Sequence, residues 1–411
     1  MDKKTNVKMG TDFGEFLRIN RYYILIFFIP VSLATGPAIP DILITLSSLI
    51  FIYDYHKTIF TKKFLLDKIV LVFLSFWVYL IFNSLLYDIE YIGKSIVFIR
   101  FFFLIFIFQL CLTDINKNKL LIKYWVYFLI FVLAITLLQR FDGNYENIFG
   151  IRGNSHRLTL LLHDKLAVGN YLIKIFPFMI VYSFFYEKKY YLSSILSIIF
   201  IITVLLSGER AASIILIVYL IMFVSLIKIR FAILLSLIFF IFIFFATSID
   251  LSLYKESAAY YRLDRFFFML EIIKQPNLYF NSPWGQLNSV GLELFKNNYL
   301  FGIGANSFEY ICNNILKINS SIVCSTHPHN YIIELLSSLG ILGTCLFLSI
   351  IMIVVKKGFE MGANQKFMQR SFLIQIIAIF WPLVPTMSIL NNWNLSIAFF
   401  GLSLIFFKIT D

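Results

Sequence analysis

The sequence predicts an all-α, polytopic integral membrane protein with about twelve transmembrane helices. Of its 411 residues, 60% are hydrophobic and 14% are charged, whereas soluble domains have roughly 45–50% and about 25%. The 48 Phe and 23 Tyr residues are typical of lipid-facing helices and aromatic belts. This composition excludes a cytosolic globular enzyme, a disordered protein and a nucleic-acid binder. The net charge of +12 needs no nucleic-acid partner, because the cytoplasmic loops of membrane proteins are basic.

Apolar runs between charged residues define the expected spans, since a spanning helix needs roughly 17–25 apolar residues. The first two runs are short and are separated by Gly36-Pro37, so we expect a tilted hairpin there. The twelve runs are 22–36, 39–53, 69–86, 92–112, 121–138, 166–186, 190–206, 211–227, 231–249, 329–355, 371–389 and 392–408.

Lys and Arg predict the orientation. With the N-terminus inside, every short inner loop is basic, as the positive-inside rule requires, and both termini are cytoplasmic. Residues 1–411 then form a single membrane domain with two long outer segments, about 139–165 and 250–328. Residues 250–328 contain two helical patterns that predict amphipathic helices on the membrane surface. The patterns are Leu263, Phe266, Phe267, Leu270 and Ile273, and Leu287, Val290, Leu294 and Phe295.

Residues 325–330 (Ser-Thr-His-Pro-His-Asn) end the second outer segment just before an apolar run. Pro328 suits the first turn of a helix, so we expect His329 in that turn, at the outer membrane boundary. The helix dipole there disfavours imidazolium, and a neutral imidazole can act as a general base. Alternatively, His327 and His329 only cap the helix. Ser337, Gly340 and Gly343 are spaced by three and predict a small face for close helix packing.

A second polar feature is the outer turn Ser-Gly-Glu-Arg-Ala-Ala at 207–212, between two apolar spans. Charges at such depth usually face a cavity or a partner. Arg210 is a candidate for binding phosphate oxygens, which arginine contacts bidentately without losing its proton. The alternative is a local ion pair between Glu209 and Arg210.

Other basic residues lie in the two outer segments, against the positive-inside bias, or within the predicted spans. A pyrophosphate substrate would explain the outer ones, although any single one is more often a solvated loop charge. Cations within spans are functional candidates by default. The outer residues are Arg152, Arg157, Lys165, Arg262 and Arg265, and Arg100 and Lys174 lie within spans.

Two cysteines, Cys312 and Cys324, fall in the second outer segment. If that segment is periplasmic, the compartment is oxidising and we expect a disulfide between them. The chain has no Walker A, HExxH or CxxC motif, and the spacing of His156 and His163 is no strong metal signature. We therefore expect neither a cofactor nor a metal.

Three motifs resemble those of bacterial O-antigen ligases. His329-Asn330, nine residues, Gly340, two residues and Gly343 resemble the family pattern H-N-x9-G-x-x-G. Residues 207–211 resemble the family's arginine turn, and residues 301–308 (Phe-Gly-Ile-Gly-Ala-Asn-Ser-Phe) resemble its "GiG-x-x-x-F" stretch. The predicted topology, about twelve spans with a long outer loop just before the histidine motif, also resembles that of the family.

The resemblance implies a GT-C-like, metal-independent, inverting glycosyltransferase without a cofactor. Such an enzyme would move a glycan from undecaprenyl pyrophosphate to a hydroxyl of lipid A–core, at the periplasmic face of the bacterial inner membrane, in lipopolysaccharide biosynthesis. An O-antigen or polysaccharide polymerase of the same superfamily, with a lipid-linked glycan as acceptor, is the alternative. A twelve-span secondary transporter is a second alternative, but the chain shows none of the internal repeats common in transporters.

The resemblance also suggests individual roles. His329 matches the family histidine, the expected base, and Arg210 matches the arginine that binds the donor pyrophosphate. Arg262 or Arg265 would be the family's loop arginine. We expect further help with the donor from Arg157 and Arg100, and supporting roles for His327, Asn330 and Glu209.

Overall fold

The computed structural model describes residues 13–87, 89–154, 157–185, 187, 190–227, 230, 233, 237, 275, 277–318, 323–361, 366–382 and 386–408. Within these residues the protein is built from helices and contains no β-strand, apart from one isolated bridge between Glu146 and Arg152. The all-α prediction is therefore confirmed for the described part of the chain.

In the described part of residues 13–141, eight helices follow one another: α1 (Phe13–Leu33), α2 (Ala38–Ile59), α3 (Lys62–Leu65), α4 (Lys68–Tyr87), η1 (Ile89–Tyr91), α5 (Ile92–Val97), α6 (Ile99–Cys111) and α7 (Ile115–Phe141). The middle of the chain forms α8 (Val168–Ile175), α9 (Pro177–Phe185), α10 (Tyr190–Leu206), α11 (Arg210–Ile227), α14 (Asn277–Asn281), α15 (Pro283–Asn297) and α16 (Phe308–Ile318). The last part forms α17 (Tyr331–Met361), α18 (Lys366–Ile379), α19 (Asn392–Ser403) and η4 (Leu404–Phe406).

Five described helices are long and apolar enough to cross a membrane, so the count of twelve spans is not confirmed. They are Ala38–Ile59, Lys68–Tyr87, Ile89–Cys111, Ile115–Phe141 and Tyr331–Met361. Other apolar helices are shorter, among them α10 and α11. The expected span 166–186 is divided into α8 and α9, which meet at Pro177, because proline lacks the N–H that would continue the helix. Most of the expected span 231–249 lies outside the described residues.

The run 371–389 is only half helical, which corrects the prediction of a full span there. Helix α18 ends at Ile379, and residues 380–382 and 386–391 are not helical. Pro382 follows shortly after the helix end, where proline and the restriction on the residue before it oppose a helix. The segment 386–391 instead runs to the start of α19, where Asn391 caps the helix by accepting a hydrogen bond from Trp393 N at 2.9 Å.

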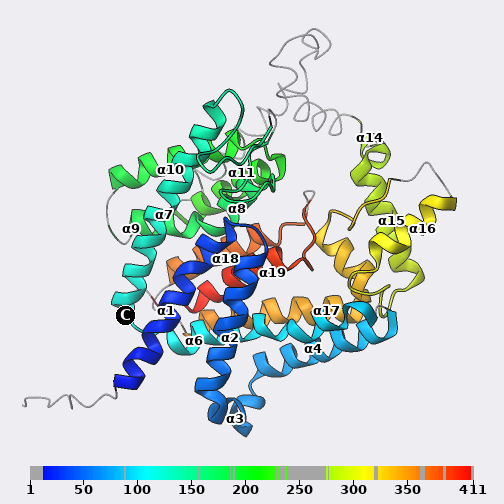
Figure 1. The fold of residues 1–411 in the computed structure, drawn as a ribbon, viewed down its shortest axis with the longest axis horizontal. Coiled ribbons are helices and arrows are strands. Elements are labelled where there is room, and N and C mark those ends of the chain that lie inside the picture. Colours follow the sequence, from blue (N-terminus) through cyan, green and yellow to red (C-terminus); the bar gives the residue numbers. More distant parts are fainter. Residues whose placement is uncertain are drawn as a thin grey trace, which may run out of the picture.

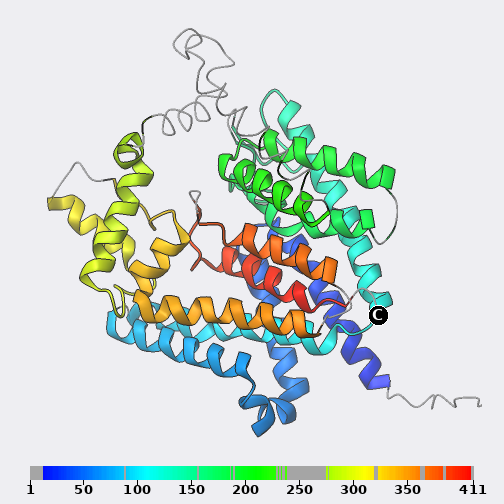
Figure 2. The ribbon, with the colours of Figure 1, turned by 180° about the vertical axis from the view of Figure 1, so that it is seen from behind.

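The helices pack around a core rich in aromatic side chains. Phe399 of α19 packs against Phe73 of α4 and Phe101 of α6, with ring centroids 5.9 Å and 5.3 Å apart. Helices α4 and α17 run side by side (Figures 1 and 2). Helices α14–α16 form a cap at the end of the molecule opposite the start of α1 and the C-terminal end (Figures 1 and 2).

The cap has its own small core. Leu287, Val290 and Leu294 of α15 are buried together with Phe308 and Cys312 of α16. The helical pattern at 287–294 is therefore confirmed, with Phe295 only half-buried; the pattern at 263–273 lies outside the described residues. A disulfide joins Cys312 to Cys324, with Cα atoms 5.7 Å apart, and ties the end of the outer segment to α16.

Helix α17 is broken at Gly340, whose φ of 63° and ψ of −173° are not helical. The break frees backbone groups that the segment around the GiG stretch then pairs. Ile303 N donates to Ser337 O at 2.9 Å, and Ile341 N donates to Tyr299 O at 2.8 Å. Gly340 therefore joins the GiG stretch to the histidine helix, instead of forming the small packing face that its spacing predicts. Gly343 does allow close packing, because a Cβ there would lie 2.5 Å from the Tyr79 ring.

We expect Gly340→Ala to destabilise the protein. The backbone conformation at Gly340 is accessible almost only to glycine and costs other residues about 1–3 kcal/mol. An added Cβ would also lie 2.3 Å from Leu300 O. Thermal unfolding of the purified protein in detergent should begin at a lower temperature than for the wild type. Gly143→Ala is the control, since no atom of the described residues lies within 4 Å of a Cβ built there; equal unfolding temperatures for the two variants would contradict this account.

Candidate active site

The two histidines lie in a loop before α17, which corrects the placement of His329 in the first helical turn. The helix begins at Tyr331, and Asn330 is its cap, because Asn330 Oδ1 accepts from Ile332 N at 3.0 Å and Ile333 N at 3.2 Å. Asparagine is among the preferred residues for this position. His329 has a φ of 59°, a left-handed backbone conformation that is uncommon for residues other than glycine.

Both imidazoles point to one backbone carbonyl. The distance from Thr386 O to His329 Nδ1 is 3.0 Å and to His327 Nε2 is 3.1 Å. A carbonyl only accepts, so each of these nitrogens carries the hydrogen, and the other nitrogen of each neutral ring is an acceptor. His329 Nε2 lies 3.3 Å from Ser325 Oγ, and His327 Nδ1 lies 2.9 Å from Thr326 Oγ1.

Burial keeps both imidazoles neutral. His327 is buried, and this burial, together with the neighbouring His329, lowers the pKa of His327 to about 4. His329 is half-buried, and burial lowers its pKa from the usual value of 6.5, opposed by the hydrogen bond to Thr386. The loop therefore holds a neutral imidazole with an acceptor Nε2 near neutral pH, as a general base requires.

The turn at 207–210 is held by the carboxylate of Glu209. Glu209 is buried and accepts hydrogen bonds from the N–H groups of Gly169 and Asn170 at the start of α8. A carboxylate is favourable at a helix start because N–H groups there have no partner within the helix. Burial raises the pKa of Glu209 to about 7, and the positive charge of Arg157 opposes this shift.

Arg210 follows directly as the first residue of α11, so the Glu209 contacts fix where its side chain begins. Its guanidinium lies over the ring of Trp284, 4.8 Å from the centroid. Trp284 belongs to α15, which packs against the histidine loop: a Cβ on Gly291 would lie 3.2 Å from Pro328 and 2.6 Å from Ile333. Helix α15 therefore contacts both the arginine turn and the histidine motif.

Three residues at this end of the molecule were not singled out from the sequence as site residues. Trp284 could have been noticed as a tryptophan in the outer segment that also contains Arg262 and Arg265, since arginine favours tryptophan faces. Tyr331 accepts a hydrogen bond from the buried Lys174 Nζ at 2.7 Å. The ammonium of Lys174 also interacts electrostatically with the carboxylate of Glu209. The third is Glu334, a carboxylate buried one turn into α17.

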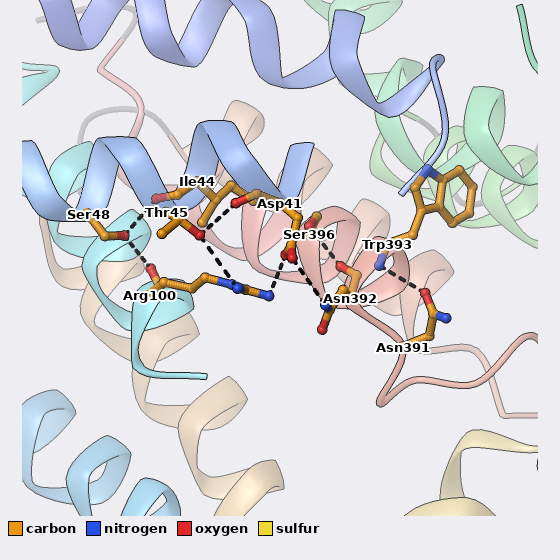
Figure 3. A network of polar contacts seen from close by, with 9 residues as sticks. All are labelled: Asp41, Ile44, Thr45, Ser48, Arg100, Asn391, Asn392, Trp393 and Ser396. Carbon is orange, nitrogen blue, oxygen red and sulfur yellow. Dashed lines mark hydrogen bonds and ion pairs between the residues drawn. The ribbon is translucent and has the colours of Figure 1, made fainter. Parts of the chain in front are cut away.

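Arg100 belongs to a network of polar contacts that includes residues of α2 and α19 (Figure 3). Its guanidinium is ion-paired with Asp41 of α2, and Asn392 at the start of α19 donates to Asp41 at 3.2 Å. Ser48 of α2 donates to Arg100 O at 2.9 Å. The arginine therefore joins α6 to α2 and, through Asp41, to α19.

The remaining candidates fall into two groups. Arg152 is exposed and lies 3.2 Å from Glu146, whereas Arg157 is half-buried beside the Glu209 turn, where Leu158 N donates to Ser207 O at 3.1 Å. Arg262, Arg265 and His156 lie outside the described residues. Within the described part of the chain, no three His, Cys, Asp or Glu side chains are grouped so that they could hold a metal.

These features define an all-helical membrane protein. Helix α15 of its cap contacts both the turn that carries Arg210 and the loop that carries the neutral His329. A family model described as O-antigen ligase matches residues 195–348, a range that contains both. The match confirms the resemblance to the O-antigen ligase and polymerase superfamily and supports a glycosyltransferase-like membrane enzyme. No curated protein matches the chain.

Proposed function

We propose that this protein is an O-antigen ligase-type glycosyltransferase. It transfers a glycan from undecaprenyl pyrophosphate to a hydroxyl of lipid A–core, with inversion and without a metal. The observation that carries this proposal is His329: a neutral imidazole whose Nδ1 is bound by Thr386 O, so that Nε2 is the basic nitrogen.

The reaction is a single displacement. The acceptor oxygen attacks the anomeric carbon, its proton passes to His329 Nε2, and the bond from that carbon to the pyrophosphate oxygen breaks. Undecaprenyl pyrophosphate leaves with the electron pair of this bond. Because the nucleophile enters opposite the leaving group, the anomeric configuration inverts.

The leaving pyrophosphate gains charge in the transition state, and fixed cations stabilise such charge. We assign this role to Arg210, whose turn is held by Glu209, and to Arg157 beside the same turn. Arg262 or Arg265 is proposed as the loop arginine. Arg100, with its guanidinium paired to Asp41, is left in a structural role. His327 shares the Thr386 carbonyl and supports the position of His329.

The proposed location is the bacterial inner membrane, with the site at the periplasmic face and both termini in the cytoplasm. The start of α1 and the C-terminal end lie together, away from the cap of α14–α16 (Figures 1 and 2), which supports this orientation. The disulfide in the cap suits the oxidising periplasm.

Deletion of the gene tests the ligase against the polymerase. A ligase is the step that joins the finished glycan to lipid A–core, so we expect all glycan-capped lipopolysaccharide to disappear, with restoration by the wild-type gene. The measurement is the lipopolysaccharide profile on a gel. A single repeat unit remaining on the core would indicate a polymerase and contradict the ligase proposal, and an unchanged profile would contradict both.

A further inference from the structure

Glu334 lies in the first turn of α17, five residues after His329, and its carboxylate is buried. A buried carboxylate is costly unless hydrogen bonds satisfy it. Its partners lie far along the chain, in the segment before α19: Ser388 Oγ donates to one oxygen, and Ile389 N donates to the other at 2.9 Å. Glu334 therefore attaches this segment to the histidine helix.

The attached segment is the one that binds the imidazoles. Thr386, two residues before Ser388, supplies the carbonyl that contacts both His329 Nδ1 and His327 Nε2. Thr386 N also donates to His329 O at 2.8 Å. From the opposite side, Asn394 of α19 donates to Ser388 O at 2.6 Å.

A hydrogen-bonding partner on one ring nitrogen decides which nitrogen is the base and how the ring is oriented. For His329 that partner is Thr386 O, a backbone atom whose position depends on the fold of residues 386–389. Because Pro382 and the end of α18 leave this segment without helical hydrogen bonds, side-chain contacts such as those of Glu334 are needed to hold it.

We propose that Glu334 is a positioning residue for transfer: by binding Ser388 and Ile389 it holds the Thr386 carbonyl that orients the His329 imidazole. This inference rests on the proposed function, since it assumes that His329 is the base. Glu334 contacts no substrate in this account, and its negative charge is not required.

The chemistry of the two partners allows a sharp test. Glutamine can accept from the Ile389 N–H with its oxygen and donate to the Ser388 hydroxyl with its amide, so Glu334→Gln preserves both attachments. Glu334→Ala removes both. Initial rates are measured with purified enzyme, a lipid-linked glycan donor and lipid A–core. We expect Glu334→Ala to lower kcat by up to roughly 100-fold, the effect of a displacement of about 1 Å, with the KM for the donor unchanged.

Glu334→Gln should restore kcat to within a few-fold of the wild type. Glu360→Ala is the matched control, because Glu360 is on the same helix and exposed. If Glu334→Gln is as inactive as Glu334→Ala, the carboxylate acts through its charge or proton and the inference is wrong. Wild-type kcat in Glu334→Ala also overturns it.

Two further variants distinguish a failure of the proposed role of Glu334 from a failure of the proposed function. Ser388→Ala removes one attachment only, so it decides the matter if Glu334→Ala does not reach the membrane: reduced kcat supports the inference, and wild-type kcat refutes it. His329→Ala is measured in parallel. Full transfer by His329→Ala would defeat the proposed function itself, whereas an inactive His329→Ala beside a fully active Glu334→Ala defeats only the role of Glu334.

Discussion

Replacing His329 with alanine is expected to reduce glycan transfer by about 100- to 10,000-fold, the usual contribution of a general base. The variant loses the acceptor Nε2 that would take the proton of the acceptor hydroxyl, while the Asn330 cap of α17 stays intact. The measurement is the rate of transfer by purified protein, normalised to the amount of protein in the membrane.

The pH dependence of the wild type gives a second readout for the same residue. A base works in its neutral form, and burial lowers the pKa of His329 below 6.5. The rate should therefore be independent of pH just above 6.5 and should fall only at lower pH. His56→Ala is the control for the substitution, because His56 is exposed and its Nδ1 bonds to Tyr53 O of its own helix. Undiminished transfer by His329→Ala would refute the assignment of the base.

Replacing Arg210 with alanine is expected to lower kcat by roughly 100- to 1,000-fold, the scale seen when one group that stabilises transition-state charge is removed. Arg210→Lys should recover only part of this loss, because lysine keeps the charge but cannot form the bidentate contact. The Arg210 guanidinium lies over the ring of Trp284, and under the proposed function this fixed position would reduce the reorganisation needed as the pyrophosphate leaves.

Arg152→Ala is the matched control for Arg210, since Arg152 is also an outer arginine but is exposed and paired with Glu146. It should retain wild-type transfer. If Arg152→Ala and Arg210→Ala lose activity equally, the loss reflects the general positive charge of the outer surface, and the specific role of Arg210 is wrong.

The helical class and most helix positions were predictable, because apolar runs and charged residues are local signals. The end of α18 was not predicted: residues 371–389 are apolar throughout much of their length, and only Pro382 and Pro385 signal that the run is not one helix. The break of α17 at Gly340 was not predicted either, because the spacing of Ser337, Gly340 and Gly343 was interpreted as a packing face. Glycine spacing suits both close packing and a kink, and only the contacts of residues 299–304 decide between them.

In the candidate site, too, some residues were predictable from local sequence and others were not. His329 and Arg210 stand out because histidine beside proline and arginine between apolar spans are unusual in a membrane protein. Thr386 and Ser388 do not stand out, since nothing local in threonine or serine marks them as partners of residues more than 50 positions away.

The sequence by itself determined that the chain is a membrane protein, where most of its described apolar helices lie, and which histidine and arginine are candidates for chemistry. These properties follow from residue type and spacing along one segment. Only the tertiary structure decided that His329 precedes its helix, that its Nδ1 meets the Thr386 carbonyl, and that Glu334 holds the segment carrying that carbonyl. Hydrogen bonds between distant segments depend on how the helices pack, and that packing is a property of the whole chain.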